Sequence, residues 1–217
     1  MRVVIAGGHG KIALLLERLL AGRGDQAVGL VRNPAHVADV SDAGAEAVVC
    51  DLEAASADDV AALLSGAAAV VFAAGAGAGS GAPRKDTVDR GASVLMADAA
   101  GRAGVRRFVQ ISSMGAGQPP RPGTDEVWAA YIAAKTAAED DLRARDLDWT
   151  IVRPGHLTDA PATGRVRLAV PPVPAGNVPR ADVAAVIAAL LDEPGTWHQT
   201  LELTGGDSPV AAAVRST

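Results

Sequence analysis

The sequence predicts a three-layer α/β fold built around a mostly parallel, doubly wound sheet, and three observations predict it. Short β-branched runs alternate with longer Ala- and Leu-rich segments of helical period. Hydrophobic residues make up 49% of the chain and aromatic residues only 3%, so Ala, Val, Leu and Ile must build the core. The length of 217 residues suits one such domain and is short for two. Repeated βα order implies right-handed crossovers, which place helices on both faces of the sheet.

The first 153 residues carry the βα order. We expect strands near 2–6, 26–32, 45–50, 68–74, 106–112 and 148–153. We expect helices near 10–22, 56–65, 86–103 and 125–146. Sheets of this kind bind ligands at the carboxyl ends of the strands, where the strand order reverses.

The segment 154–217 differs because prolines interrupt it, at Pro161, Pro171, Pro172, Pro174 and Pro179. We expect a helix near 181–192, a strand near 199–203 and a poorly ordered tail over 211–217. The chain is interpreted as one domain, with a binding core over 1–153 and a small substrate-shaping lobe over 154–217.

Charge and cysteine content exclude several classes of function. A formal net charge of −5 without a dense Lys/Arg run opposes nucleic-acid binding, so a small-molecule partner is favoured. Cys50 is the only cysteine, which excludes an internal disulfide, and it is interpreted as a small buried residue at a strand end. The four histidines lack metal-ligand spacing, so no metal is expected. The apolar N-terminal run is too short for a signal peptide, and no run reaches membrane-spanning length, so we expect a cytoplasmic protein without membrane attachment.

A glycine turn, Gly7-Gly8-His9-Gly10, ends the first predicted strand and opens directly into the first predicted helix. Glycine lets phosphate groups approach the bare N–H groups at a helix N-terminus. The spacing Gly7-x-x-Gly10-x-x-Ala13 departs from G-x-G-x-x-G, and a purely structural turn is the alternative. Its position on the first strand favours a dinucleotide site, and therefore a Rossmann fold.

The ends of the next two strands suggest which dinucleotide binds. Arg32 follows the second predicted strand, where a guanidinium can bind a 2′-phosphate, so NADP(H) is preferred and NAD(H) is possible. A solvated surface arginine is the alternative. Asp51 and Leu52 follow the third strand, where the carboxylate can accept a hydrogen bond from the adenine amino group or cap a helix.

Tyr131 is the only tyrosine, Lys135 is one of three lysines, and they stand four residues apart in a predicted helix. At this spacing they share one helix face. A phenol is a poor acid or base near neutral pH until a nearby cation favours its phenolate, and an ammonium one turn away supplies that cation. The alternative is a partly buried aromatic residue beside a solvated lysine.

This pair, the glycine turn and Ser112-Ser113 together resemble the short-chain dehydrogenase/reductase family. The chain is most similar to the compact atypical members, which are NAD(P)H-binding oxidoreductases related to flavin and biliverdin reductases within the epimerase/dehydratase-like superfamily. The resemblance covers nearly the whole chain, and its further blocks are 72–75, 107–115, 151–155 and 180–184.

The resemblance implies a role for each matching residue. Tyr131 would be the general acid that protonates a carbonyl oxygen, and Ser113 would orient that oxygen, with Ser112 more structural. Lys135 would hold the nicotinamide ribose and favour the phenolate. The residues expected to bind the cofactor are Gly7, His9, Gly10, Lys11, Ile12, Arg32, Asp51, Leu52, Ala73, Ala74, Gly75, Ile111, Tyr131, Lys135, Pro154, Gly155 and Leu157. Asp89 stands where the family carries an Asn, which leaves the proton relay open.

These residues predict an NADP(H)-dependent oxidoreductase that transfers hydride to a carbonyl, quinone or flavin-like acceptor. The first alternative is an NAD(P)-binding redox sensor without turnover, against which the Tyr131/Lys135 pair argues. An epimerase or dehydratase is a poorer fit because the chain lacks the long C-terminal substrate domain of the sugar-nucleotide members. A monomer and a homodimer are both compatible with the Ala-rich helices.

Three features outside the motifs are interpreted structurally. The acidic run Glu139-Asp140-Asp141 is expected to be an exposed helix face, because adjacent helix positions point in different directions. Trp128, Trp149 and Trp197 are expected to be packing anchors, with Trp128 the one that faces the pocket if any does. Residues 75–82 are rich in glycine, which suits either a flexible linker or a mobile rim above the cofactor.

Overall fold

The computed structural model describes residues 1–77, 79–119 and 123–217. Its strands are β1 (Arg2–Ala6), β2 (Gln26–Val31), β3 (Glu46–Val49), β4 (Ala69–Phe72), β5 (Arg107–Ile111), β6 (Asp148–Pro154), β7 (His156–Thr158), β8 (Arg165–Ala169), β9 (Asn177–Pro179), β10 (Gln199–Gly205) and β11 (Ser208–Pro209). Its helices are α1 (Lys11–Gly22), η1 (Pro34–His36), α2 (Val37–Asp42), α3 (Ala57–Leu63), α4 (Ala82–Arg84), η2 (Lys85–Ala92), α5 (Ser93–Ala103), α6 (Glu126–Arg143), α7 (Arg180–Leu190), η3 (Pro194–Thr196) and α8 (Val210–Arg215).

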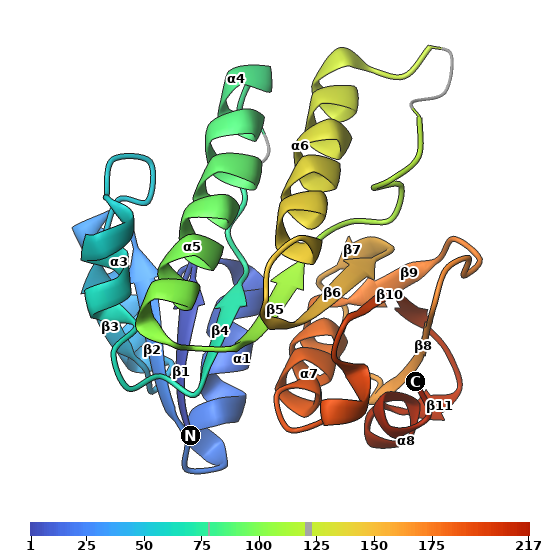
Figure 1. Ribbon diagram of the computed structural model, residues 1–217. Helices are drawn as coiled ribbons and strands as arrows, with labels where there is room; N and C mark the ends of the chain where they lie inside the picture. Colours follow the sequence, from blue (N-terminus) through green and yellow to red (C-terminus); the bar gives the residue numbers. More distant parts are fainter. Residues whose placement is uncertain (78, 120–122) are drawn as a thin grey trace.

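Nine strands of the described chain form one sheet in the order β11-β8-β10-β6-β5-β4-β1-β2-β3. The six strands β3-β2-β1-β4-β5-β6 are mutually parallel, and β10 is parallel to β6. Within the described residues only β8 runs against this direction, because it pairs antiparallel with both β10 and β11. The order reverses between β1 and β4, so the crevice at their carboxyl ends is the expected ligand position (Figure 1).

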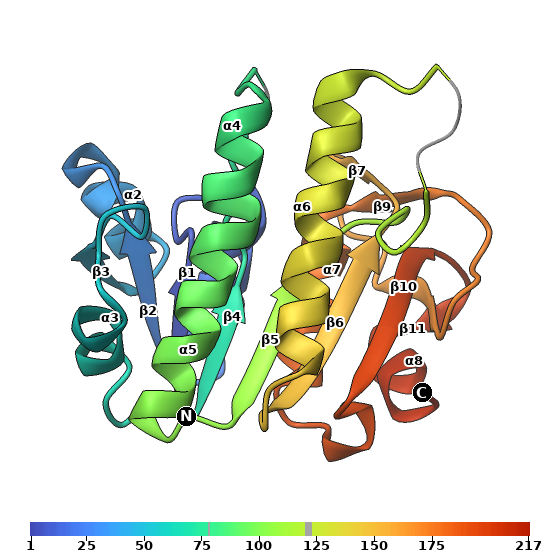
Figure 2. The same ribbon diagram turned by 45° about the horizontal axis from the view of Figure 1, so that its top comes forward.

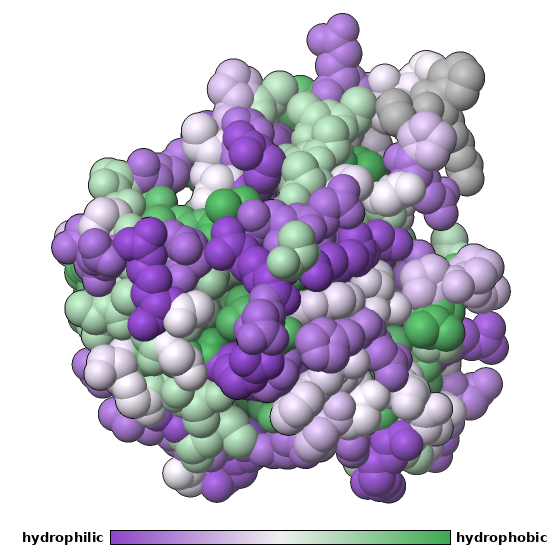
Figure 3. Space-filling model, in the orientation of Figure 1, coloured by the Kyte–Doolittle hydropathy of each residue, from purple (hydrophilic) through white to green (hydrophobic). Residues whose placement is uncertain are grey.

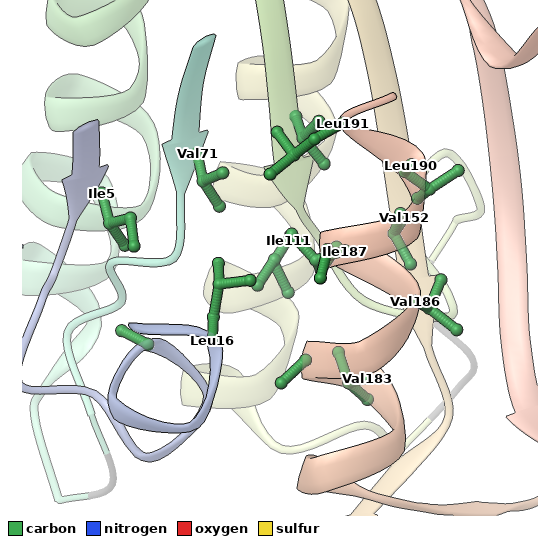
Figure 4. Close-up of a cluster of buried hydrophobic side chains, with 14 of the residues drawn as sticks. Ile5, Leu16, Val71, Ile111, Val152, Val183, Val186, Ile187, Leu190 and Leu191 are labelled. Atoms are coloured by element: carbon green, nitrogen blue, oxygen red, sulfur yellow. The ribbon is translucent and has the colours of Figure 1, made fainter. Parts of the chain in front are cut away.

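Two layers of helices cover the sheet. Helices α3, α5 and α6 lie on one face and α1 and α7 on the other (Figure 2). Alternate residues of β1 serve both layers, since Val3 and Ile5 join one buried cluster while Val4 and Ala6 join the other. Figure 4 shows the first cluster, where side chains of α1 and α7 point toward Val71 and Ile111. The predicted three-layer Rossmann fold is therefore confirmed.

The segment after β6 extends the same sheet through β10, β8 and β11, while β7 and β9 pair separately in a two-stranded parallel sheet. The prediction of a poorly ordered tail is wrong, because α8 packs against α7 and β8 with Ala213 and Val214 buried. A helix of six residues is too short for its apolar period to stand out in the sequence.

The predicted helix over 86–103 begins earlier and is irregular. The chain runs from α4 into η2, which is π-helical over Lys85–Ala92, and then into α5. π-helical turns are rare and often lie at functional sites. Segment η2 packs along α6, and the two helices lie side by side in Figures 1 and 2. The predicted glycine-rich segment 75–82 leads into this helix, and Ala78 within it lies outside the described residues.

The molecular surface is mainly polar on the face that carries α5 and α6, where hydrophobic residues form small patches among hydrophilic ones (Figure 3). Within the described ranges, no helix combines the length and the apolar character needed to cross a bilayer.

Glu17 of α1 is a carboxyl group with 0% exposure directly beneath the glycine turn. A Cβ added to Gly8 or Gly29 would lie 3.1 or 2.6 Å from its Oε1, so the carboxyl group packs against both glycines. Neither oxygen has a hydrogen-bond partner among the described residues. Burial raises the pKa of Glu17 from 4.5 to about 8, partly offset by the charge of Arg18.

Removing this carboxyl group is expected to flatten the dependence of stability on pH. The unfolded chain ionises Glu17 near its ordinary pKa and the folded chain only near pH 8, so stability falls as pH rises between those values. In the wild type the free energy of unfolding decreases between pH 5 and pH 8. In Glu17→Gln this decrease should be smaller by on the order of 3 kcal/mol. Urea unfolding of both proteins at pH 5 and pH 8 measures this difference. The same change in unfolding free energy with pH in both proteins would contradict the raised pKa of Glu17.

Candidate functional site

The glycine turn lies at the carboxyl end of β1 and is closed by a hydrogen bond of 2.8 Å from the Gly10 N–H to the Gly7 carbonyl. Gly7 has a φ of +79°, and a Cβ there would lie 2.7 Å from the Cα of Ala74. Glycine is therefore required both by the backbone conformation and by the close approach of β4. The turn fixes where α1 begins.

The N-terminus of α1 is available to an anion. Its N-cap residue, Gly10, provides no side-chain cap, and the first turn of the helix carries no acidic residue. The first N–H groups of a helix have no partner within the helix, and the helix dipole makes this end positive. A phosphate group fits here without displacing any side-chain cap.

Beside the turn, a cavity of about 380 Å³ opens at the carboxyl ends of β1 to β4. Nine predicted cofactor residues line it, namely Gly7, His9, Gly10, Arg32, Asp51, Leu52, Ala73, Ala74 and Gly75. Its other walls come from Leu30, Val31, Asn33, His36, Cys50, Glu53, Ala76, Arg84, Val88 and Ala92. Cys50 lies at the end of β3 as predicted and packs against the core, but it is half-buried rather than buried and also lines this cavity.

Two guanidinium groups meet at one carboxylate on the rim of the cavity. Arg32 and Arg84 each contact Oε2 of Glu53, at 2.8 and 2.7 Å, and the Thr87 hydroxyl donates to Oε1 at 2.7 Å. The Thr87 hydrogen bond and the two arginines hold the pKa of Glu53 below its ordinary value, against a smaller effect of burial. Arg32 is thus part of a charged cluster rather than an isolated surface residue, and Arg84 adds a second cation that the motifs did not indicate.

The Tyr131/Lys135 pair lies on α6 opposite η2. Lys135 has 3% exposure, and its Nζ lies 3.2 Å from Oδ1 of Asp89 and donates to the Ile111 carbonyl at 3.3 Å. The other oxygen of Asp89 accepts the Ala76 N–H at 3.1 Å. Asp89 thereby joins the lysine to the strand-end loop that lines the cavity. The lysine ammonium lies 5.7 Å from the centre of the Tyr131 ring.

Two further side chains surround Tyr131. The Nζ of Lys85 lies 5.3 Å from the ring centre, on the side of η2. The Trp128 ring lies 5.2 Å from the Tyr131 ring, with a tilt of 40° between the planes. Trp128 is 51% exposed and Trp197 is 39% exposed, so their assignment as packing anchors is wrong, while Trp149 is buried as expected. Trp128 stands in the first turn of α6.

The two serines after β5 have different environments. The Ser112 hydroxyl is buried and donates to Oε1 of Glu139 at 2.5 Å, which suits a structural role. The Ser113 hydroxyl is half-buried and donates to the Met114 carbonyl at 3.2 Å. Rotation about one side-chain bond is enough to free Ser113 for a ligand.

The expectation that Glu139 is exposed is wrong. Glu139 has 0% exposure and receives hydrogen bonds from Nε and Nη2 of Arg153 at 2.9 and 2.5 Å and from Nη2 of Arg143 at 2.7 Å. Its neighbour Asp140 is exposed, as expected of adjacent helix positions. The buried carboxylate ties α6 to β6 and to the serine loop.

The remaining predicted cofactor residues do not line the cavity beside the turn. Lys11 points to Asp159, at 2.6 Å from its Oδ2. Ile12 and Leu157 pack against the core, and Ile111 offers its carbonyl to Lys135. Pro154 accepts the Met114 N–H at 3.0 Å, and Gly155 packs too closely on Gly176 to admit a Cβ.

Arg84, Lys85 and Glu53 were not predicted as site residues. Lys85 could have been identified from the sequence, because the chain has only three lysines. It stands four residues before Asp89, directly before the helix predicted over 86–103. Glu53 and Arg84 carry no such signal in the sequence, since each is recognisable only once the loop after β3 and the start of the helix come together.

The residues present fit a dinucleotide. The bare N-terminus of α1 suits a pyrophosphate, the cavity beside it suits an adenosine, and the guanidinium pair suits a further phosphate.

Comparison with known proteins agrees with this geometry. Residues 7–194 match the family model described as NAD(P)H-binding. Over 216 residues the chain is 35% identical to a Bacillus subtilis protein named uncharacterized sugar epimerase YhfK, with 99% of each chain covered. A solved structure from Bacillus halodurans, provisionally described as an NAD-dependent epimerase/dehydratase, has a TM-score of 0.91 at 34% identity, with both chains covered completely. ChuY of Escherichia coli O157:H7, described as an anaerobillin reductase, has a TM-score of 0.78 at 27% identity, covering 96% of this chain and 98% of its own.

Proposed function

Since this chain belongs to the NAD(P)H-binding family, we propose that it is an NADP(H)-dependent oxidoreductase that reduces a carbonyl, quinone or flavin-like acceptor. Membership also confirms the predicted resemblance to the compact atypical short-chain dehydrogenases/reductases. The observation that carries the proposal is the buried Lys135–Asp89 ion pair beside Tyr131, next to a nucleotide-sized cavity. The reductase description of ChuY, at 27% identity, supports the same reaction class.

The nicotinamide cofactor, when bound, supplies the hydride. In carbonyl reduction the Tyr131 hydroxyl donates its proton to the acceptor oxygen, which becomes an alcohol. The Ser113 hydroxyl donates a hydrogen bond to the same oxygen and orients it. Lys135, fixed by Asp89 and by the Ile111 carbonyl, stabilises the phenolate that proton transfer leaves on Tyr131. Flavin and quinone reduction needs less from Tyr131, because no carbonyl carbon must be attacked.

A panel of aldehydes, ketones, quinones and flavins, assayed for NADPH oxidation by absorbance, tests this proposal. We expect turnover with at least one acceptor class. Binding of NADPH without turnover on any of them would favour the redox sensor. The name of the Bacillus subtilis relative favours an epimerase as the second candidate, and such an enzyme would convert its substrate without net NADPH oxidation.

The preference for NADPH is expected to depend on the arginine pair at the cavity rim. Arg32→Ser and Arg84→Ser should each weaken NADPH binding by about tenfold, since each removes a charge-assisted hydrogen bond to a 2′-phosphate. Binding of NADH, which lacks that phosphate, should change little. Glu53→Gln is the matched control, because it frees both guanidinium groups from their carboxylate and should tighten NADPH binding. Fluorescence titration of the wild type and the three variants with each cofactor measures these affinities. Equal affinities of the wild type for NADPH and NADH would contradict the preference for NADPH.

A further inference from the structure

Lys85 is a nearly buried cation that the proposed mechanism does not use. It has 9% exposure, and its Nζ donates to the Gly77 carbonyl at 2.9 Å. The same Nζ lies 5.3 Å from the centre of the Tyr131 ring. Lys85 therefore lies beside the proposed general acid and is fixed there by the loop that follows β4.

Lys85 differs from the other two lysines in its lack of a carboxylate partner. Lys11 pairs with Asp159 and Lys135 pairs with Asp89, whereas Lys85 forms no ion pair with any of the residues that the structure describes. An ammonium has three N–H donors, and one carbonyl satisfies only one of them. A cation removed from water without a counter-charge is unfavourable, so this position calls for an anion from outside the chain.

The direction of the side chain separates it from the adenosine cavity. The cavity is lined by Arg84, Val88 and Ala92, which are spaced one helical turn apart. The residues that follow the first two of these, Lys85 and Asp89, point instead to Tyr131 and Lys135 of α6. An anion bound by Lys85 would therefore lie on the Tyr131 side of η2. The pyrophosphate has its own place at the N-terminus of α1.

An exposed apolar surface adjoins the Tyr131 ring. Trp128 is 51% exposed with its ring 5.2 Å from that of Tyr131, and Val127 beside it is 39% exposed. An exposed indole next to a site offers a face on which a planar ligand can stack. The apolar face and the unpaired ammonium flank the same phenol from two helices.

We propose that Lys85 binds an anionic group of the acceptor and that Trp128 stacks on its planar part. The acceptor class is then a planar, conjugated molecule that carries a carboxylate or phosphate. The identification of the bound molecule as an acceptor rests on the proposed reductase function. Binding of an anion by Lys85 does not depend on turnover.

The kinetic test compares an acidic acceptor with its neutral match, 6-formyl-2-naphthoate and 6-formyl-2-naphthamide. Wild-type protein should have a KM about tenfold lower for the acid, as one charge-assisted hydrogen bond contributes. Lys85→Met should abolish this discrimination, and Lys85→Arg, which keeps the charge, should restore most of it. Trp128→Leu should raise KM for both acceptors without changing their ratio.

The binding test uses 2-naphthoate and 2-naphthamide, which cannot be reduced at a formyl group, on the NADP⁺-saturated protein in a calorimeter. Wild-type protein should bind the acid about tenfold more tightly, and Lys85→Met should bind both equally. Equal affinities in the wild type, or a preference for the acid that survives in Lys85→Met, would overturn the proposal. Circular dichroism and thermal unfolding of each variant verify that it is folded.

The two tests separate the two proposals. A Lys85-dependent preference for 2-naphthoate without reduction of any acceptor supports the anion site and rejects the reductase. Reduction of both formyl compounds with no preference for the acid supports the reductase and rejects the anion site.

Discussion

Tyr131→Phe is expected to lower kcat for carbonyl reduction by about two to four orders of magnitude, which is the usual contribution of a positioned general acid. The substitution removes one hydroxyl and keeps the ring, so contacts with Trp128, Lys85 and Lys135 remain. Cofactor affinity should therefore change little. Steady-state kinetics with a reactive aldehyde and a fluorescence titration with NADPH measure the two effects separately.

The acceptor class supplies the control for this prediction. Reduction of a flavin or a quinone does not require protonation of a carbonyl oxygen during attack at carbon, so Tyr131→Phe should affect it far less. Unchanged turnover with an aldehyde would remove Tyr131 from the mechanism. Loss of NADPH binding in the variant would instead indicate that the hydroxyl holds the cofactor.

Glu139→Ala is expected to lower the free energy of unfolding by about 3 kcal/mol, at the lower end for breaking a buried ion pair. The substitution leaves the Arg153 guanidinium, which has 8% exposure, without the carboxylate that accepts two of its hydrogen bonds. The Ser112 hydroxyl loses its partner as well. Because Ser112 adjoins Ser113, kcat should fall together with stability.

The next residue of the same acidic run is the matched control. Asp140 is exposed and pairs with Arg143 at 2.9 Å, so Asp140→Ala should cost less than about 1 kcal/mol. Urea unfolding of both variants tests the contrast, with Glu139→Gln expected to fall between them. Equal losses for Glu139→Ala and Asp140→Ala would show that the buried network contributes little.

The parts of the fold that were predictable are those with a local pattern. The strands β1, β2, β5 and β6 are apolar runs of regular length, and turns or helices with their own signals bound them, so their predicted bounds agree with the structure closely. The short strands β7, β9 and β11 have two or three residues each, which leaves no pattern to detect. The π-helical geometry of η2 has no residue signature, because it arises where the helix packs on its surroundings.

The site divides in the same way. Tyr131 and Lys135 were recognisable because their relation is one helical turn, whereas the Asp89 partner of Lys135 is defined by the packing of η2 on α6. The burial of Glu139 did have a signal. It falls on one stripe of α6 with buried Ile132, Lys135 and Leu142, at helical spacing, and its place in an acidic run concealed this. The guanidinium pair at Glu53 brings together the loop after β2, the loop after β3 and helix α4. No local sequence pattern relates these three segments.

The continuous helical segment formed by α4 and η2 carries Arg84 at the wall of the cavity beside the glycine turn and Lys85 beside Tyr131, so it borders both halves of the crevice. Thermodynamic linkage gives this arrangement a quantitative consequence. Whatever factor the 2′-phosphate contributes to acceptor affinity, the acceptor must contribute the same factor to the affinity for the 2′-phosphate. A double cycle that pairs NADPH and NADH with an acidic and a neutral acceptor therefore measures the coupling free energy between the 2′-phosphate and the acidic group.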